Sequence, residues 1–199
     1  MKQCLALAIL AITCLGARAA EWASSQVLSN NTRVYAVVPA GATVSSLVGH
    51  VFASTGGSLI LYQAGSPATV STNAMAAGAT IIMTSTNGLA PEDLILIQGT
   101  NELFQFTQIN AVVTGLIHLT NSVNAAPAVT EFPLYVGAKI YPLTKIGGHQ
   151  LTSGAGLSAT LAANGGTVYL PPNSRPGVIE VRATGTVTNC LVIAGGTRW

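Results

Sequence analysis

The residues that could carry acid, base or metal chemistry are few and widely spaced. None of the three histidines, His50, His118 and His149, has a second histidine, a cysteine or a carboxylate at the spacing of a metal site. His50 and His118 lie within predicted strands, where a hydrogen-bonded side chain is the commoner role. His149 follows Gly147 and Gly148 in a predicted loop. We therefore predict no metal site.

Carboxylates and nucleophiles form no catalytic pattern either. Asp93 is the single aspartate, so any Ser-His-Asp triad would depend on it, and no Gly-x-Ser-x-Gly turn is present to expose a serine. A glycosidase pair would have to come from Glu92, Asp93 and Glu102, but adjacent strand residues such as Glu92 and Asp93 point to opposite faces. The sequence therefore predicts no enzymatic activity, no cofactor and no small-molecule substrate.

Two kinds of isolated side chain remain. Exposed aromatic rings can stack on sugars, and Tyr62 and Tyr141 are the candidate glycan contacts. Cys190 is the only cysteine after residue 19 and stands in an apolar run that ends at Ile193. We expect its thiol to be buried as a small hydrophobe rather than exposed as a reactive group.

Charge is scarce throughout the chain. Lys, Arg, Asp and Glu make up 7% of the 199 residues, against about a quarter in an average soluble domain. Residues 20–199 hold six basic and six acidic side chains and are formally neutral. No cluster of Lys and Arg indicates nucleic acid or an anionic membrane as a partner. Because weakly charged surfaces repel each other little, this composition favours association between copies of the chain.

The first 19 residues have the pattern of an export signal. Lys2 precedes an apolar stretch from Leu5 to Leu15, and small residues at Ala17 and Ala19 occupy the positions that a signal peptidase reads. The stretch is shorter than the ~20 residues of a membrane-spanning helix. We predict a signal peptide or, alternatively, an N-terminal arm at residues 1–19. The leader would contact a membrane only transiently, and the protein would be extracellular or part of a virion.

Beyond the leader, the pattern is that of an all-β protein. Short runs of Val, Ile, Leu, Thr, Tyr and Phe are separated by Gly, Asn and Pro, without a sustained helical period. Gly56 and Gly57 are expected to form a hairpin turn, and the four apolar residues 94–97 predict a central strand. The predicted strands are residues 33–38, 44–53, 58–63, 80–84, 93–98, 102–109, 115–120, 134–136, 139–143, 157–161, 167–170, 178–183 and 187–193.

The spacing of these strands divides the chain into two units. Strands that recur about every 8–12 residues between residues 75 and 138 predict a small closed barrel. The strands before this segment are too few for a two-sided core, but together with those after it they reach the strand number of a sandwich. We predict a β-sandwich, formed by residues 20–74 and 139–199, with a small β-barrel inserted at residues 75–138.

Several segments of the middle unit follow a recurring order. They are Gly78-Ala79-Thr80-Ile81, Asn87-Gly88-Leu89, Glu92-Asp93-Leu94-Ile95-Leu96-Ile97, Asn101-Glu102, Ile117-His118-Leu119-Thr120 and Asn124-Ala125-Ala126. In this order the unit resembles a small barrel module of structural proteins in tailed-bacteriophage virions. Residues 47–53 and 57–63 are similar to a sandwich hairpin of the same proteins. The resemblance implies a structural role in a virion.

Composition, fold pattern and resemblance together predict a non-enzymatic structural subunit of a virion or extracellular assembly. It would self-associate, or bind other structural subunits, through neutral β-rich surfaces and terminal arms. Two segments are predicted to reach a neighbouring subunit, residues 21–31 after the leader and residues 195–199. The predicted assembly contacts are Trp22 in the first segment and Gly195, Gly196, Arg198 and Trp199 in the second. Two alternatives remain open. One is a secreted bacterial filament or surface-layer protein, which the leader favours, and the other is a carbohydrate-binding adhesin module.

Overall fold

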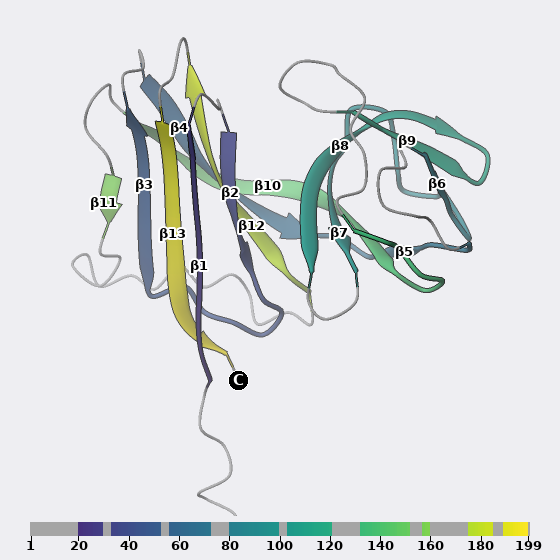
Figure 1. The fold of residues 1–199 in the computed structure, drawn as a ribbon, viewed down its shortest axis with the longest axis horizontal. Coiled ribbons are helices and arrows are strands. Elements are labelled where there is room, and N and C mark those ends of the chain that lie inside the picture. Colours follow the sequence, from purple (N-terminus) through teal and green to yellow (C-terminus); the bar gives the residue numbers. More distant parts are fainter. Residues whose placement is uncertain are drawn as a thin grey trace, which may run out of the picture.

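A computed structural model describes residues 20–29, 33–52, 56–72, 80–99, 103–120, 132–151, 157–159, 175–184 and 189–198. Within these residues the protein is all-β. Figure 1 shows two facing layers of strands on one side and a curled, barrel-like unit on the other. The predicted fold class, a β-sandwich with a small inserted β-barrel, is confirmed.

The outer layer of the sandwich is a four-stranded antiparallel sheet. Its strands lie in the order β1-β13-β3-β11. β1 and β11 are therefore its two edges, one long and one short. The bounds are Ala20–Ser29 for β1, Asn189–Arg198 for β13, Ser46–Phe52 for β3 and Leu157–Ala159 for β11.

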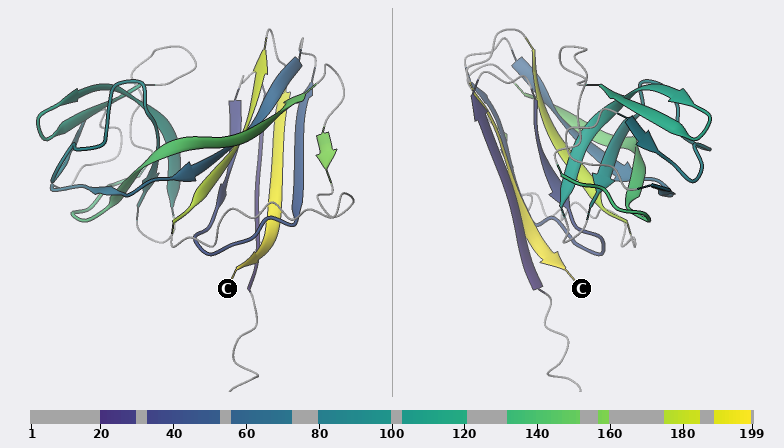
Figure 2. Two further views of the ribbon diagram at one scale, coloured as in Figure 1. Left: turned by 180° about the vertical axis from the view of Figure 1, so that it is seen from behind. Right: turned by 45° about the vertical axis from the view of Figure 1, so that its right-hand side comes forward.

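The second sheet is longer and runs through both units. Its path is β2-β12-β4-β10-β7-β8-β9-β6, and β5 also pairs with β10. β2, β12, β4 and the C-terminal part of β10 form the inner layer of the sandwich, and the other strands curl away from it into the barrel (Figure 2). The bounds are Arg33–Val38 for β2, Gly177–Thr184 for β12, Gly56–Ala64 for β4, Lys139–Leu151 for β10, Leu94–Gln98 for β7, Phe104–Val113 for β8, Leu116–Thr120 for β9, Thr80–Ile82 for β6 and Ala68–Thr69 for β5.

The inner layer is apolar on the side that faces the outer layer. Strand residues alternate between faces, and in β12 Ile179 and Val181 join Cys190 of β13 in the sandwich core. Cys190 is fully buried, as predicted, and burial raises the pKa of its thiol. By the same alternation, Val178 and Glu180 of β12 point to the opposite face.

The inserted unit closes on itself. β10, β7, β8, β9 and β6 are consecutive neighbours. An isolated bridge between Val70 and Met83 joins the segments that follow β5 and β6, and β5 pairs with β10. The ring encloses an aliphatic core that includes Ile95. Val70 and Ile140 also belong to this core, so it draws on residues at both flanks of the predicted insertion 75–138.

The apolar strand β7 lies between β10 and β8, as predicted. Ile95 and Ile97 point into the barrel core, whereas Leu96 packs on the opposite side with Phe106 and Tyr141. β7 is apolar on both faces because one face lines the barrel and the other packs against the sandwich. This second contact fixes the barrel on the inner layer.

The predicted hairpin at Gly56 and Gly57 is wrong. Both glycines are part of β4, which begins at Gly56. β3 pairs with β13 and β11 in the outer layer, whereas β4 pairs with β12 and β10 in the inner layer. The chain therefore crosses between the two layers at this point instead of returning along the same sheet.

Two further local predictions are wrong. His149 lies in β10 rather than in a loop, because this strand continues to Leu151, past the expected end at residue 143. Residues 136–137 form a turn where a strand was expected at 134–136, although Leu134 is fully buried in the barrel core. The predicted strand 167–170 and the predicted leader 1–19 lie outside the described residues.

Candidate functional site

An ion cluster lies on the face of the inner layer that points away from the sandwich core. Glu180 of β12 is fully buried, and its carboxylate forms ion pairs with Arg33 of β2 and with Arg182. Nε and Nη2 of Arg182 each lie 3.3 Å from an oxygen of Glu180. The hydroxyl of Tyr62 in β4 donates a 2.9 Å hydrogen bond to Glu180 Oε2. Three neighbouring strands thus bring four polar side chains together.

The register of the three strands explains this convergence. Arg182 lies opposite Arg33, and Val178 lies opposite Tyr62, so Glu180 occupies the position between these two pairs on the same face. Diagonal neighbours across antiparallel strands are within reach of long side chains. A single carboxylate is therefore reached from both flanking strands.

An aromatic group from the barrel covers the cluster. The ring centroid of Phe106 in β8 lies 5.2 Å from the guanidinium carbon of Arg33, within the range of a cation–π contact. The rings of Tyr35 and Tyr62 lie 5.3 Å and 6.0 Å from that of Phe106. Strands of the sandwich supply the charges and a barrel strand supplies the cover, so the cluster belongs to the contact between the two units.

Burial and charge shift the titration of these groups. Burial, and next the Glu180 carboxylate beside it, raise the pKa of Tyr62 to about 12. Burial lowers the pKa of Arg33, although Glu180 opposes that change. No buried polar side-chain atom among the described residues lacks a hydrogen-bond partner. Since donors occupy both oxygens of Glu180, the cluster is built to hold strands together rather than to present a base to a substrate.

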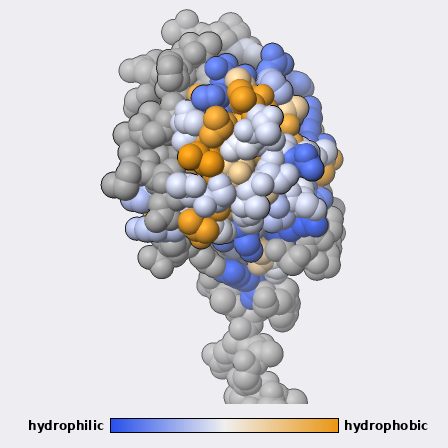
Figure 3. Space-filling model, turned by 90° about the vertical axis from the view of Figure 1, so that its right-hand side faces the viewer, coloured by the Kyte–Doolittle hydropathy of each residue, from blue (hydrophilic) through white to orange (hydrophobic). Residues whose placement is uncertain are grey.

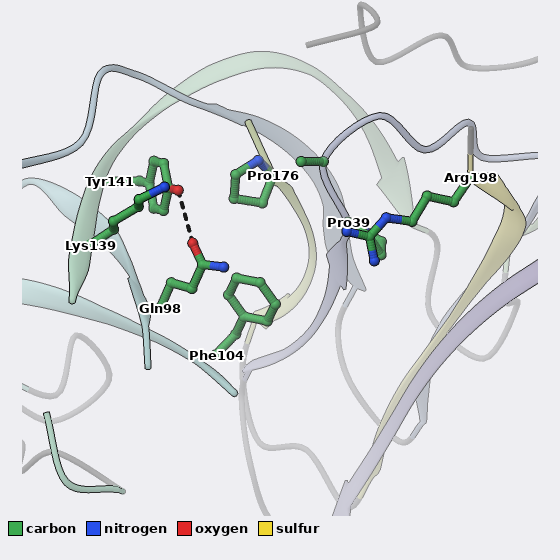
Figure 4. A pocket seen from close by; sticks show the side chains of 8 residues that line it. Pro39, Gln98, Phe104, Lys139, Tyr141, Pro176 and Arg198 are labelled. Atoms are coloured by element: carbon green, nitrogen blue, oxygen red, sulfur yellow. Dashed lines mark hydrogen bonds between the residues drawn. The ribbon is translucent and has the colours of Figure 1, made fainter. Parts of the chain in front are cut away.

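A small cavity lies beside this contact, where the sandwich meets the barrel (Figure 4). Its volume is about 180 Å³ and it is partly open to solvent. The sandwich contributes the segment after β2, the residue before β12 and the end of β13, and the barrel contributes β7, β8 and the start of β10. The lining residues are Pro39, Ala40, Gln98, Phe104, Lys139, Tyr141, Pro176 and Arg198.

The two terminal segments predicted as assembly arms pair with each other. β1 and β13 are antiparallel neighbours, with Trp22 opposite Gly196, Ala23 opposite Gly195 and Ala20 opposite Arg198. Both segments are therefore strands of the outer layer, held together by the backbone hydrogen bonds between β1 and β13, and their contact with a neighbouring subunit stays a prediction. Trp199 lies outside the described residues.

The candidate glycan contacts Tyr62 and Tyr141 are not exposed rings. Tyr62 is buried in the ion cluster, and Tyr141 of β10 is buried where the barrel packs against the inner layer. The hydroxyl of Tyr141 nevertheless lines the cavity, where it donates a 2.9 Å hydrogen bond to Gln98 Oε1. The expected exposure of these tyrosines is therefore wrong, and their relation to a glycan stays a prediction.

The sequence pattern did not indicate Arg33 and Glu180 as members of a site, nor Lys139 as a cavity residue. Glu180 and Arg182 stand two residues apart in an otherwise apolar strand, a spacing that places both on one face. That spacing was a usable signal for a buried ion pair. Nothing in the sequence links Lys139 to Arg198, because the cavity exists only once the two units are packed together.

Two residues weighed above as catalytic or metal-binding candidates, Asp93 and His118, have local structural contacts. Asp93 Oδ2 accepts a 2.7 Å hydrogen bond from the backbone N–H of Ala90 in a turn. His118 Nδ1 lies 3.0 Å from the hydroxyl oxygen of Thr80 on the neighbouring strand. No group of three or more His, Cys, Asp or Glu residues suited to a metal ion occurs among the described residues. In the same part of the chain, no helix is long and apolar enough to cross a membrane.

Apolar side chains are exposed at the far end of the barrel. Ile82 of β6 and Val113 of β8 both lie opposite Leu116 of β9, so the three residues form one row across adjacent strands. Ile82 is 43% exposed and Val113 is 51% exposed, and Val136 in the turn before β10 is 64% exposed. Figure 3 looks onto this end and shows apolar side chains among weakly polar ones, with few strongly hydrophilic groups between them.

Comparison with known proteins assigns the chain to no family. No protein-family model matches it, and no curated protein matches it. A solved structure of infectious bursal disease virus, Gx strain, is 12% identical over 90% of this chain and 40% of that chain, with a TM-score of 0.13. A likeness of this size carries no argument about fold or function.

Proposed function

We propose that the protein is a non-enzymatic structural subunit of a virion or extracellular assembly, and that it associates with further copies through an open strand edge. The observation that carries the proposal is the outer edge of β1. This strand is ten residues long and pairs with β13 on one side, and no strand among the described residues pairs with its other side.

Within the described residues, the β1 edge has none of the usual protection against strand addition. Natural edge strands are commonly short, or carry lysine, proline or a bulge that prevents another chain from pairing with them. β1 contains no lysine or proline and a single charged residue, Glu21, and its register with β13 runs unbroken from Ala20 to Ser29. The opposite edge of the same sheet, β11, is three residues long. The long open edge therefore supports a role in strand pairing between subunits.

The hydrogen-bond pattern shows which backbone groups face this edge. The carbonyl oxygens of Thr197 and Gly195 accept hydrogen bonds from the backbone N–H groups of Thr43 and Ser45. The backbone groups of these odd-numbered residues of β13 therefore face away from β1. In an antiparallel pair, groups alternate between the two sides of a strand. Ser25 lies opposite Ile193, another odd-numbered residue, and so directs its N–H to the open edge.

Two further features support the same proposal. The chain is 7% charged, and residues 20–199 are formally neutral, so copies repel one another weakly. The exposed row at the barrel end adds apolar surface of a kind that protein contacts commonly cover. Neither feature specifies a catalytic or a transport role.

A pair of proline variants tests the proposal. Ser25→Pro removes an N–H that faces the open edge, whereas Ser24→Pro removes one that faces β13, because Ser24 lies opposite Ala194. We expect Ser25→Pro to keep the circular dichroism spectrum and urea midpoint of the wild type but to sediment as a monomer where the wild type assembles. Ser24→Pro is the matched control and should lose unfolding free energy. Unchanged assembly of a folded Ser25→Pro variant would overturn the proposal.

The N-terminal residue of the assembled protein distinguishes a secreted filament or surface-layer protein from a virion component. A chain that begins at Ala20 would favour a secreted filament or surface-layer protein, because it shows removal of residues 1–19. A chain that retains Met1 would favour a virion component. Mass spectrometry of the purified assembly gives this answer directly.

A further inference from the structure

The cavity between sandwich and barrel concentrates positive charge in a chain that has little charge. Lys139 and Arg198 line it, and no carboxylate is among its described lining residues. A third cation, Arg175, lies near Tyr141. Burial raises the pKa of the Tyr141 phenol, and the positive charge of Arg175 opposes that rise. Three of the six basic residues in the segment 20–199 thus gather around one cavity. Their summed field attracts anions to this position.

The cavity also presents neutral hydrogen-bonding groups and a ring. The carbonyl oxygen of Gln98 accepts the hydrogen bond from Tyr141, which turns the amide nitrogen of Gln98 toward the ring of Phe104 (Figure 4). Pro39 and Pro176 provide rigid apolar walls on the sandwich side. An amide donor beside an aromatic face is suited to the hydroxyl groups and C–H face of a sugar ring.

The size of the cavity limits the ligand to about one ring. Pockets for drug-sized molecules are about 300–1,000 Å³, whereas this one is about 180 Å³. From charge, hydrogen-bond donors, the ring of Phe104 and this volume, we propose that the cavity binds one anionic monosaccharide unit, carboxylated or sulfated. Lys139 contacts the acidic group, Gln98 donates to a hydroxyl, and the sugar ring packs against Phe104, while Arg198 lies beside Pro39 on the other side of the cavity and adds to the positive field (Figure 4). This inference goes beyond the assembly role and does not depend on it.

Isothermal titration of the full-length protein tests the inference with glucuronate, a sulfated hexosamine, glucose and inorganic sulfate as probes. We expect saturable binding of glucuronate or the sulfated sugar. We expect glucose and inorganic sulfate each to bind at least about tenfold more weakly, because glucose lacks the acidic group and inorganic sulfate lacks the sugar ring. A preference between the two acidic sugars identifies the carboxylate or the sulfate ester as the natural group. Binding should weaken as the salt concentration rises.

Variants with a matched control locate the site. Lys139→Gln should weaken binding by about tenfold, the size expected for a lost charge-assisted hydrogen bond. Phe104→Leu should weaken binding of the acidic sugar without affecting binding of inorganic sulfate. Lys145→Gln removes the same charge from an exposed position on the same strand outside the cavity, and should leave binding unchanged.

Three results would overturn the inference. They are no binding of either acidic sugar, inorganic sulfate binding as tightly as the sugars, and equal losses in Lys139→Gln and Lys145→Gln. Each can arise whether or not the protein assembles, so failure here is distinguishable from failure of the assembly proposal. Circular dichroism of each variant confirms that it is folded.

Discussion

Glu180 is the residue on which the contact between sandwich and barrel depends. A carboxylate in the interior is tolerated when donors and opposite charges surround it. Here Arg33, Arg182 and Tyr62 supply these groups, and Phe106 of the barrel covers Arg33. Loss of Glu180 therefore removes the carboxylate that balances the charge of the buried Arg33 guanidinium.

Replacing Glu180 with glutamine should strongly destabilise the fold. In Glu180→Gln the Arg33 side chain, which is 11% exposed, loses the partner of its ion pair, and breaking a buried pair in this way costs about 3–5 kcal/mol. The Arg182 side chain is 41% exposed, so Arg182→Gln should cost no more than about 1 kcal/mol. Urea unfolding measures both values. Similar losses in the two variants would contradict the central role of Glu180.

Tyr62 should make the protein sensitive to alkaline pH. Its pKa is about 12 in the folded protein and 10.0 as the reference value. Because the folded state holds the phenol proton more tightly, this group contributes stability that is complete below about pH 10 and is lost as the pH rises toward 12. Tyr62→Phe should therefore show a smaller fall in unfolding free energy over that range.

A tyrosine outside the cluster provides the control for this pH effect. Tyr135 is half exposed, and Tyr135→Phe should leave the alkaline fall as it is in the wild type. Urea midpoints at a series of pH values supply the comparison. An identical alkaline fall in wild type and Tyr62→Phe would show that the phenol does not contribute.

At the scale of elements, β13 has a close contact that requires glycine. The segment from Thr43 to Ser45 crosses the end of β13 and donates hydrogen bonds of 2.8 and 2.9 Å to Thr197 and Gly195. A Cβ atom on Gly196 would collide with the carbonyl group of Thr43. Backbone cannot move aside as a flexible side chain does, so the segment would have to separate from β13.

Gly196→Ala should therefore reduce the free energy of unfolding by about 2 kcal/mol or more, as an overpacked contact does. Gly147→Ala is the matched control in β10, where the nearest atom, on Leu61, lies 3.7 Å from the added Cβ. This control should change stability by less than about 1 kcal/mol. Urea unfolding distinguishes the two, and tolerance of Gly196→Ala would contradict the close approach of residues 43–45.

The sequence predicted the elements better than their connections. Periodicity located β2, β7 and β12 well, because runs such as residues 94–97 are apolar wherever they pack. It missed β1, whose Ala- and Ser-rich sequence has a single β-branched residue, Val27, of the kind that indicates a strand. The glycine pair at residues 56–57 predicts a hairpin between β3 and β4, because turn residues alone carry no information on whether the chain crosses between layers. The spacing of Glu180 and Arg182 indicates an ion pair on one face of a strand. The contact of this pair with Arg33 and the lining of the cavity depend on strands far apart in sequence, which spacing does not relate.

At the scale of the whole molecule, β10 ties the two units together. Its residues 139–142 pair with β7 in the barrel, and residues 143–151 pair with β4 in the sandwich. The ion cluster adds a buried contact between the same units. One strand shared by two cores favours unfolding of both in a single step.

A matched pair of core variants tests this coupling. Ile95 lies in the barrel core and Ile179 in the sandwich core, and both are fully buried. Ile95→Ala and Ile179→Ala should each cost about 2–5 kcal/mol and should each shift one common urea transition. The readouts are circular dichroism and tyrosine fluorescence followed together. A biphasic transition in either variant would show that the units unfold independently.

We propose above that copies of this neutral chain assemble through the open edge of β1. The most direct test is sedimentation velocity of the purified wild-type protein over a range of concentrations, with electron microscopy of the fast-sedimenting material. If copies pair through β1, the protein grows from monomer to regular filaments, rings or shells as its concentration rises, and the Ser25→Pro variant does not. A wild-type protein that stays a single monomeric species at high concentration would contradict it.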